Sequence, residues 1–348
     1  MGQVQVVVAT PVEEELVARL RTVDERLEIQ FEPELLPPPR YPSDHGGERD
    51  FRRTPDEQRR FEELVASAEV LYGIPGDTPE GLAWAVRTAP GLRFVQATAA
   101  GAGQQVRAAE LAPEELRRVA IASASGVHAV PLAEWSLLGI LAFSKNLPRL
   151  LADERDRSWP HYPNPELRGA TLLVVGVGAI GVEVARLAAA FGMRVLGVKR
   201  DPAEQTPYVD AVHAPERLRE LVAEADAIVV TLPLTDETRG MIDGETIASM
   251  KDGVILVNVG RGGVIDEDAL VDALRSGKIR GAALDVFATE PLPAESPLWE
   301  LPNVLVSPHT AALSIHENER IVELFARNLR HYLRGEELES RVRTSVFY

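Results

Sequence analysis

The stretch that decides the fold is TLLVVGVGAIGVEVARLAAAFG, residues 171–192. It opens with five residues, 171–175, that are typical of a buried β-strand. The glycine-rich run GVGAIG follows at 176–181, and apolar residues then recur at helical spacing. A strand, a tight turn and an amphipathic helix in this order predict the first βα unit of a nucleotide-binding α/β domain.

The residues of this turn point to a dinucleotide as the ligand. Gly176 permits the tight turn, Gly178 lets a pyrophosphate approach the backbone, and Gly181 lets the helix pack closely on the strand. Ala179 and Ile180 begin the helix, where main-chain N–H groups attract an anion. A GxGxxG pattern alone is weak, but its place between a strand and a helix makes dinucleotide binding the favoured interpretation.

The rest of the chain alternates in the same way between apolar strands and helical spacing. Strands are expected at 4–10, 28–32, 68–73, 92–98, 117–123, 171–176, 194–199, 225–232, 253–259, 281–287 and 303–308. Helices are expected at 12–20 and 57–68, as one long helix over 129–151, and at 314–334, whereas the Pro- and Gly-rich segment 36–56 predicts a loop. This alternation predicts an α/β protein with parallel sheets covered on both faces.

Composition limits the class of protein and its partners. The chain has 348 residues, 45% apolar and 26% charged, which suits a globular protein of two domains. Its net charge of −16 argues against nucleic acid as a partner, and a basic pocket in so acidic a chain would be informative. We expect no membrane span and no signal peptide. The absence of cysteine fits a cytoplasmic location.

Further motifs follow the glycine loop in a fixed order. They are TLPLTDETRGMID (231–243), ILVNVGRGGVIDEDALVDAL (255–274), GKIRGAALDVFATEPLP (277–293) and SPLWELPNVLVSPHTAA (296–312), with GVHAVPLAEW (126–135) upstream of the loop. Together they resemble the D-2-hydroxyacid dehydrogenase family, including glyoxylate/hydroxypyruvate reductase-like enzymes. The resemblance covers most of the chain and is most specific from residue 171 to 312.

The resemblance implies two doubly wound parallel-sheet domains and a homodimer. A Rossmann NAD(P)-binding domain at 126–310 would be inserted in a flavodoxin-like substrate domain built from 1–125 and 311–348. The active site would lie between them and act on a small 2-keto or 2-hydroxy acid of D configuration.

Three residues match the family's catalytic set: Arg261 in VGRGG, Glu290 in ATEP and His309 in SPHT. A guanidinium can bind a substrate carboxylate and carbonyl oxygen by a fork of donors. An imidazole can give a proton to the developing alkoxide, and a neighbouring carboxylate can fix its orientation. Each residue alone would be an ordinary loop residue, so this interpretation rests on their joint occurrence after predicted strands.

Other contacts are implied by position within the motifs. The residues that would line the cofactor are Pro233, Thr238, Val259, Gly260, Arg261, Asp285, His309, Ala311 and Ala312. Asp285 would accept the nicotinamide carboxamide, with a turn cap as the alternative. No metal ion is expected.

The loop ATAAGAG at 97–103 stands where the family presents backbone amides to the substrate carboxylate, here at Ala100, Gly101 and Ala102, together with Arg261 and His309. Gly103 departs from the family, which often has Asp at that place.

The segment RVLGVKRDP at 194–202 bears on the choice of cofactor. An acid usually ends this strand and accepts the ribose hydroxyls, but Lys199 stands there, followed by Arg200. Two cations favour the 2′-phosphate of NADP(H). The alternative is NAD(H), with Asp201 as the ribose acceptor.

Two other functions compete with a dehydrogenase. Some relatives of the family act mainly as regulators, so a dinucleotide-sensing binding protein with little turnover is the alternative. Formate oxidation on the same architecture is less favoured, because Glu290 stands where that branch has Gln.

Overall fold

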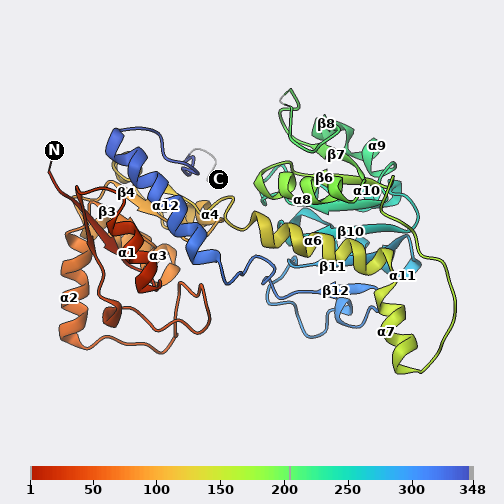
Figure 1. Ribbon diagram of the computed structural model, residues 1–348, viewed down its shortest axis with the longest axis horizontal. Coiled ribbons are helices and arrows are strands. Elements are labelled where there is room, and N and C mark those ends of the chain that lie inside the picture. Colours follow the sequence, from red (N-terminus) through yellow and green to blue (C-terminus); the bar gives the residue numbers. More distant parts are fainter. Residues whose placement is uncertain (1, 204, 345–348) are drawn as a thin grey trace. The chain divides into compact units, whose positions relative to one another are not determined.

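The computed structural model describes residues 2–203 and 205–344 and divides the chain into two units. The first consists of Met1–His128 and Leu313–Tyr348, and the second of Ala129–Ala312. Each unit has its own parallel sheet with helices packed against it (Figure 1). The predicted fold class, two parallel-sheet α/β domains with one inserted in the other, is confirmed.

The sheet of the first unit has the strand order β2-β1-β3-β4-β5. Its strands are β1 (Val4–Val8), β2 (Leu27–Gln30), β3 (Val70–Tyr72), β4 (Phe94–Gln96) and β5 (Ala120–Ala122). Val6 of the central β1 pairs with Ile29 on one side and with Val70 on the other. All neighbours are parallel, so the carboxyl ends of the strands meet at one edge.

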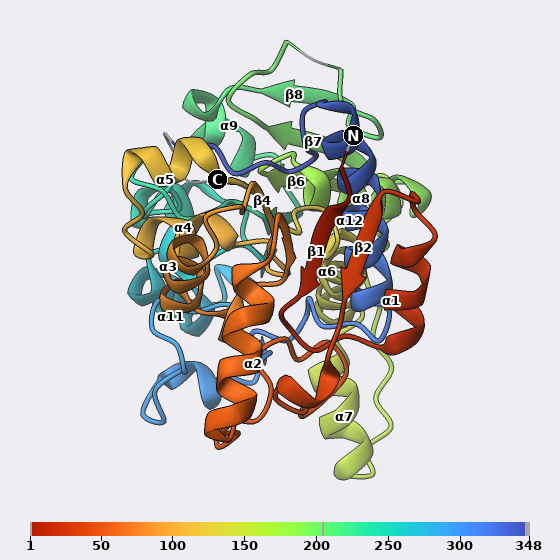
Figure 2. The ribbon, with the colours of Figure 1, turned by 90° about the vertical axis from the view of Figure 1, so that its left-hand side faces the viewer.

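Helices cover both faces of this sheet, as Figure 2 shows. They are α1 (Glu14–Arg21) and α12 (Glu317–Arg334) on one face, and α2 (Pro55–Ala66), α3 (Pro79–Thr88), α4 (Ala102–Ala108) and α5 (Pro113–Arg118) on the other. Phe325 of α12 packs against the rings of Tyr72 and Phe94. On the opposite face, Phe61 stacks on Trp84 at 5.8 Å. The strands are buried on both faces, which explains their nearly continuous apolar runs.

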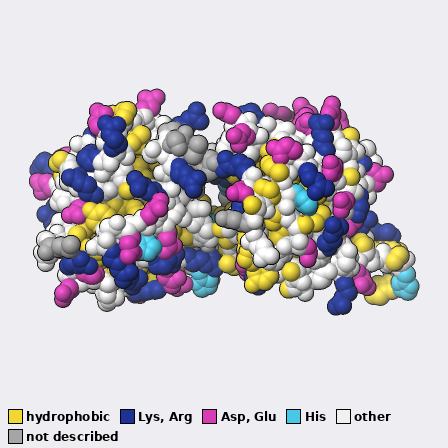
Figure 3. Space-filling view, turned by 90° about the horizontal axis from the view of Figure 1, so that it is seen from above, with side chains coloured by type: hydrophobic (Ala, Val, Ile, Leu, Met, Phe, Trp, Pro, Cys, Tyr) yellow, Lys and Arg dark blue, Asp and Glu magenta, His cyan; other side chains and the backbone are white. Residues whose placement is uncertain are grey.

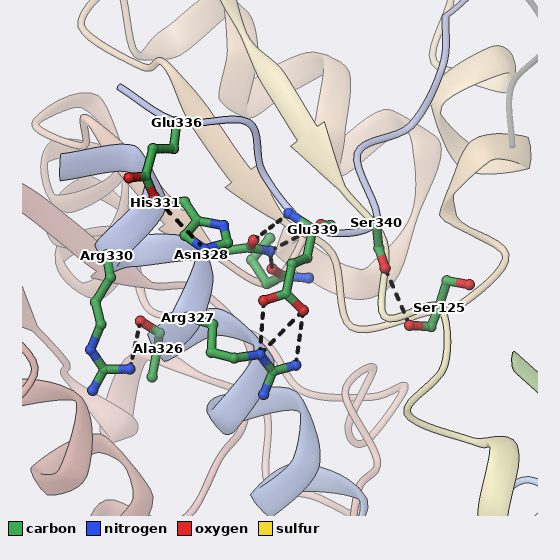
Figure 4. A network of polar contacts seen from close by, with 10 residues as sticks. Ser125, Ala326, Arg327, Asn328, Arg330, His331, Glu336, Glu339 and Ser340 are labelled. Atoms are coloured by element: carbon green, nitrogen blue, oxygen red, sulfur yellow. Dashed lines mark hydrogen bonds and ion pairs between the residues drawn. The ribbon is translucent and has the colours of Figure 1, made fainter. Parts of the chain in front are cut away.

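The segment after α12 returns to the edge of the sheet (Figure 4). Asn328 holds this return, since its side chain donates to the carbonyl oxygen of Glu339 and accepts the N–H of the same residue. Arg327 pairs with the Glu339 carboxylate through Nε and a terminal nitrogen. The main chain then bonds to β5, with the N–H of Val342 donating to Ile121 over 2.8 Å.

The second unit has a seven-stranded parallel sheet of order β12-β11-β10-β9-β6-β7-β8. Its strands are β6 (Thr171–Val175), β7 (Arg194–Val198), β8 (Ala211–His213), β9 (Ala227–Val230), β10 (Val254–Asn258), β11 (Ile279–Leu284) and β12 (Val304–Val306). From β6 the chain adds β7 and β8 on one side, and it then crosses back to add β9 on the opposite side of β6. This reversal makes the carboxyl ends of β6 and β9 the expected ligand-binding position.

Two groups of helices cover this sheet. One face carries α6 (Ala129–Ser144) and α8 (Ala179–Ala190), and the other carries α9 (Leu218–Val222), α10 (Gly244–Ser249) and α11 (Glu267–Ser276). Gly139 of α6 lies so close to β11 that an added Cβ would stand 2.5 Å from the Cβ of Ala283. The contact explains a glycine inside an otherwise apolar helix.

The prediction of a single helix over 129–151 is wrong. The structure has α6 and a separate α7 (Leu147–Arg155), with Asn146 between them in the left-handed region at φ 53°. Pro148 then stands at the start of α7, where its missing N–H costs no helical bond. The short strand β8 was not predicted, and α12 begins at Glu317 rather than near 314.

No helix within residues 2–203 and 205–344 is both long enough and apolar enough to cross a bilayer. Figure 3 shows acidic and basic side chains interspersed over the visible face of each unit.

Candidate active site

The glycine loop joins β6 to α8 as predicted, and each glycine has a different environment. Gly176 has φ 104°, and its carbonyl oxygen accepts the hydroxyl of Thr231 over 2.5 Å. An added Cβ on Gly181 would stand 2.3 Å from that same carbonyl oxygen. Gly178 has open space around its Cβ position, and Ala179 beside it is exposed. The amino end of α8 is therefore accessible to a pyrophosphate.

The cations Lys199 and Arg200 follow β7. The main-chain N–H of Lys199 donates to the carbonyl of His213, which fixes this end of the strand against β8. The Lys199 side chain is half-buried, whereas that of Arg200 is exposed and lies 3.8 Å from the carboxylate of Glu237. Asp201, the alternative ribose acceptor, instead caps a turn by accepting the N–H of Ala203.

The loop after β9 carries Pro233 and Thr238. The Thr238 hydroxyl donates to the carbonyl of Pro233 over 2.7 Å and accepts the N–H of Thr235 over 2.8 Å. Thr238 is buried, so its hydroxyl holds the loop together. Contact of either residue with the adenosine stays a prediction.

The loop after β10 presents Arg261. Asn258 fixes this loop, since its Oδ1 accepts the N–H of Gly260 and its Nδ2 donates to the carbonyl of Arg261. An added Cβ on Gly260 would stand 2.5 Å from the carbonyl oxygen of Leu232, so only glycine fits between the loops after β9 and β10. Val259, before it, is buried.

The guanidinium of Arg261 is half-buried, and its Nη1 donates to the carbonyl of Gly260 over 2.7 Å. Burial lowers the pKa of Arg261, while the charge of Glu290 acts in the opposite direction. A guanidinium held in this way is a ready partner for a carboxylate ligand.

His309 and Glu290 meet although 19 residues separate them. The Nδ1 atom of His309 lies 2.7 Å from Oε2 of Glu290, and Oε1 of Glu290 accepts the N–H of Phe287 over 3.0 Å. The carboxylate is thus fixed by its own main chain and in turn fixes the imidazole. It engages Nδ1, which leaves Nε2 as the ring nitrogen able to exchange a proton with a substrate.

Asp285 anchors the loop that carries His309. Its Oδ1 accepts the Ser307 hydroxyl over 2.6 Å and the N–H groups of Thr310 and Ala311 over 2.9 and 3.0 Å. Its main-chain carbonyl accepts the N–H of His309. Burial raises the pKa of Asp285, whereas the hydroxyl of Ser307 has the opposite effect. Asp285 therefore caps the turn at 307–311, as the alternative to carboxamide binding predicted. That Asp285 also binds the nicotinamide carboxamide stays a prediction.

Sequence reasoning missed the residues that hold these loops. Asn258, Ser307 and Thr231 all lie within the quoted motifs, each close to a predicted functional residue. The available signal was a polar residue at or directly after the end of an apolar strand. Ala311 and Ala312 lie half-buried after His309, packed against the cluster that includes α6.

The predicted substrate loop belongs to the first unit, between β4 and α4. Ala100 is exposed, Gly101 precedes the first residue of α4, and Ala102 is fully buried. The whole of Ala102, main chain included, is therefore inaccessible, whereas Ala100 and Gly101 offer accessible surface. The part of this loop in substrate binding stays a prediction.

The parallel sheet of the second unit, its glycine loop and the polar residues after β10, β11 and β12 place the protein in the class of dinucleotide-binding α/β proteins. Comparison with known proteins identifies the family within this class. Residues 137–311 match the NAD binding domain of the D-isomer specific 2-hydroxyacid dehydrogenases. The chain is 33% identical to the glyoxylate reductase of Korarchaeum cryptofilum over 81% of this chain and 85% of that protein. The chain therefore belongs to the D-isomer specific 2-hydroxyacid dehydrogenase family, as the motifs predicted.

Two further comparisons define the extent of the similarity. The chain is 41% identical to the D-3-phosphoglycerate dehydrogenase of Mycobacterium tuberculosis over 62% of its own length, and it spans only 40% of that protein. A D-isomer specific 2-hydroxyacid dehydrogenase from Xanthobacter autotrophicus, solved in complex with NADPH and MES, superposes with a TM-score of 0.76. The two sequences are 27% identical, with full coverage of both chains.

Proposed function

We propose that the protein is an NAD(P)-dependent oxidoreductase that reduces a small 2-keto acid to the D-2-hydroxy acid, or catalyses the reverse oxidation. The observation that carries this proposal is the 2.7 Å contact between His309 and Glu290. Burial lowers the pKa of Arg261 and the charge of Glu290 acts to raise it, so the third residue interacts electrostatically with this pair. The glyoxylate reductase relative supports the same class of substrate.

Each of the three residues has a distinct role in this reaction. The glycine loop at 176–181 would hold a reduced nicotinamide cofactor, which would supply the hydride for the carbonyl carbon. Arg261 binds the substrate carboxylate and polarises the carbonyl oxygen. As the carbonyl electron pair moves onto oxygen, His309 gives its Nε2 proton to that oxygen. Glu290 holds the ring by Nδ1, so that Nε2 faces the substrate.

The experiment is to follow reduced-nicotinamide absorbance with glyoxylate, hydroxypyruvate, pyruvate and longer keto acids. We expect turnover of at least one. Cofactor binding without turnover of any of them would contradict the enzyme and favour the dinucleotide-sensing alternative. Chiral analysis of the product tests the D configuration.

We propose NADP(H) as the preferred cofactor. Lys199 and Arg200 stand after β7, where an acid would bind the ribose hydroxyls and repel a 2′-phosphate. The relative solved with NADPH supports this choice. Glu237 opposes it, because its carboxylate lies 3.8 Å from Arg200 and a phosphate would have to take its place. At that distance and exposure the ion pair is weak.

We also propose a homodimer formed through α6, α7 and the segment after them. Apolar side chains are exposed there, with Trp159 at 90%, Leu151 at 56% and Leu138 at 49%. Such side chains are typical of a surface that a partner covers. Light scattering should give twice the mass of one chain, and Trp159→Ser combined with Leu151→Ser should shift it towards the monomer. A monomeric wild type would contradict the proposal. The cytoplasmic location stays a prediction.

A further inference from the structure

A cavity of about 680 Å³ lies in the first unit, outside the carboxyl ends of β1 and β3. Ala9 and Pro11, which follow β1, form part of its wall, and Pro75 and Gly76, which follow β3, form another part. The order β2-β1-β3-β4-β5 reverses direction between β1 and β3. In open parallel sheets this reversal is where ligands bind. The topology of the sheet therefore favours ligand binding in this cavity.

The lining of this cavity is basic, although the chain as a whole is strongly acidic. Arg40, His45, Arg49 and Arg53 all line it, and they come from the segment that the sequence predicted as a loop. Glu48 is the acidic residue of the lining. Arg40 is paired with the Asp44 carboxylate, so the net positive charge of the lining comes from Arg49 and Arg53 against Glu48, and this charge suits an anion.

The loop that supplies these cations is held in a defined shape. The Asp44 carboxylate is buried and accepts hydrogen bonds from the main-chain N–H, the Nε and the Nη2 of Arg40. It also accepts the N–H of Gly47, which has φ 66°. An added Cβ there would stand 2.6 Å from the Cβ of Pro37, so the loop packs closely against the preceding chain. A site of this kind is formed before a ligand arrives.

Arg53 is fixed on an aromatic wall. Its Nε donates to the carbonyl of Leu35 over 2.6 Å, and its guanidinium lies 3.8 Å from the ring centre of Phe61. Trp84 stacks on Phe61, and both rings line the cavity as its aromatic wall. Burial lowers the pKa of Arg53, because removal from water disfavours the charged guanidinium. Within residues 2–203 and 205–344, neither Arg49 nor Arg53 has a carboxylate at ion-pair distance. Arg53 is half-buried and Arg49 is exposed, and a cation without such a partner is suited to an anionic ligand, most of all where it is partly buried.

We propose that this cavity binds a small organic anion, with Arg49 and Arg53 on its carboxylate, sulfonate or phosphate group and the aromatic wall against its apolar part. The site lies wholly within the first unit and does not depend on the proposed hydride transfer. The anionic group has two sources that the experiments below distinguish, namely the end of a substrate remote from the keto group and a separate molecule.

Calorimetric titration of the full chain with phenyl phosphate, inorganic phosphate and phenol tests the site. Phenyl phosphate should bind more tightly than inorganic phosphate, and phenol should not bind. Arg49→Gln and Arg53→Gln should each weaken phenyl phosphate by about tenfold, as for the loss of a charge-assisted hydrogen bond. Arg49 is exposed, so this variant keeps the test valid if Arg53→Gln fails to fold.

Arg59→Gln is the matched control. Arg59 lies in α2, is exposed, pairs with Asp56 and does not line the cavity. The change removes the same charge and should leave phenyl phosphate binding unchanged. No binding to the wild-type chain, or equal weakening by all three variants, would overturn the proposal.

Kinetics then separate the two sources of the anion. Competition between phenyl phosphate and a keto acid substrate would assign the site to the substrate's remote end, and kcat/KM for keto acids with a second carboxylate should then fall in Arg49→Gln. Inhibition or activation that is not competitive would assign it to a separate molecule. Binding is measured without turnover, so a failed hydride transfer and a failed anion site give different results.

Discussion

The main-chain N–H of His309 donates to the carbonyl oxygen of Asp285 over 3.0 Å, so the residue that carries the imidazole is tied to the end of the neighbouring strand β11. His309 also has φ 55°, in the left-handed region. A histidine held in a sparsely populated conformation by bonds from a second loop is typical of a functional site.

Asp285→Ala should release this loop. The donors of Ser307, Thr310 and Ala311 would lose their shared acceptor, which should lower the free energy of unfolding by about 2 kcal/mol. Displacement of His309 should lower kcat by about 10²-fold. Asp285→Asn is the control, since its Oδ1 can still accept these donors, so stability should be nearly retained. Equal kcat in Asp285→Ala and wild type would contradict a positioning role.

His309→Ala should lower turnover by about 10²–10⁴-fold and leave cofactor affinity unchanged, because it removes the proton donor and spares the glycine loop. Steady-state rates and a fluorescence titration with NADPH measure the two effects. His316→Ala serves as the control, as His316 is exposed and pairs with Glu319. Turnover that survives in His309→Ala would assign the acid to another group.

Arg261→Lys should raise KM for the keto acid by roughly 10–100-fold, because an ammonium cannot reproduce the fork of donors toward a carboxylate. Arg280→Lys offers the same exchange at an exposed position of β11 and should have no effect. If KM is unchanged in Arg261→Lys, another residue binds the carboxylate.

Gly178→Ala should separate cofactor binding from folding. Nothing lies within 4 Å of its Cβ position and its φ is −95°, so the melting temperature should stay within a few degrees of wild type. The new methyl group would occupy the approach of the pyrophosphate and should weaken NADPH binding. Gly244→Ala, with an ordinary contact of 3.6 Å to Ala269, is the control for both measurements. Unchanged affinity for NADPH would exclude pyrophosphate contact at Gly178.

Removing the cations after β7 should change the cofactor preference. Lys199→Ala and Arg200→Ala should each lower kcat/KM for NADPH by about tenfold and leave that for NADH nearly unchanged. Glu237→Gln should instead raise kcat/KM for NADPH, because it removes the carboxylate that faces Arg200. A wild type that prefers NADH would defeat the phosphate interpretation.

The fold and the candidate site were predicted from the sequence to different degrees. The strands of the second unit were predicted well except β8, because buried parallel strands leave continuous apolar runs. The break at Asn146 was missed, since a left-handed residue followed by Leu-Pro still has the apolar content of a helix. The cations of segment 36–56 were assigned to a loop, and their convergence on one cavity has no signal in local spacing.

The sequence by itself determined what depends on near neighbours in the chain. The turn at Gly176, the start of α8 and the choice of Arg261, Glu290 and His309 as candidate catalytic residues all follow from short motifs. Only the tertiary structure decided which side chains meet. His309 contacts Glu290, Asp285 is occupied by the loop 307–311, and Arg53 faces the cavity beside β1 and β3. The physical reason is that parallel strands bring their carboxyl ends to one edge, where loops distant in the chain become neighbours.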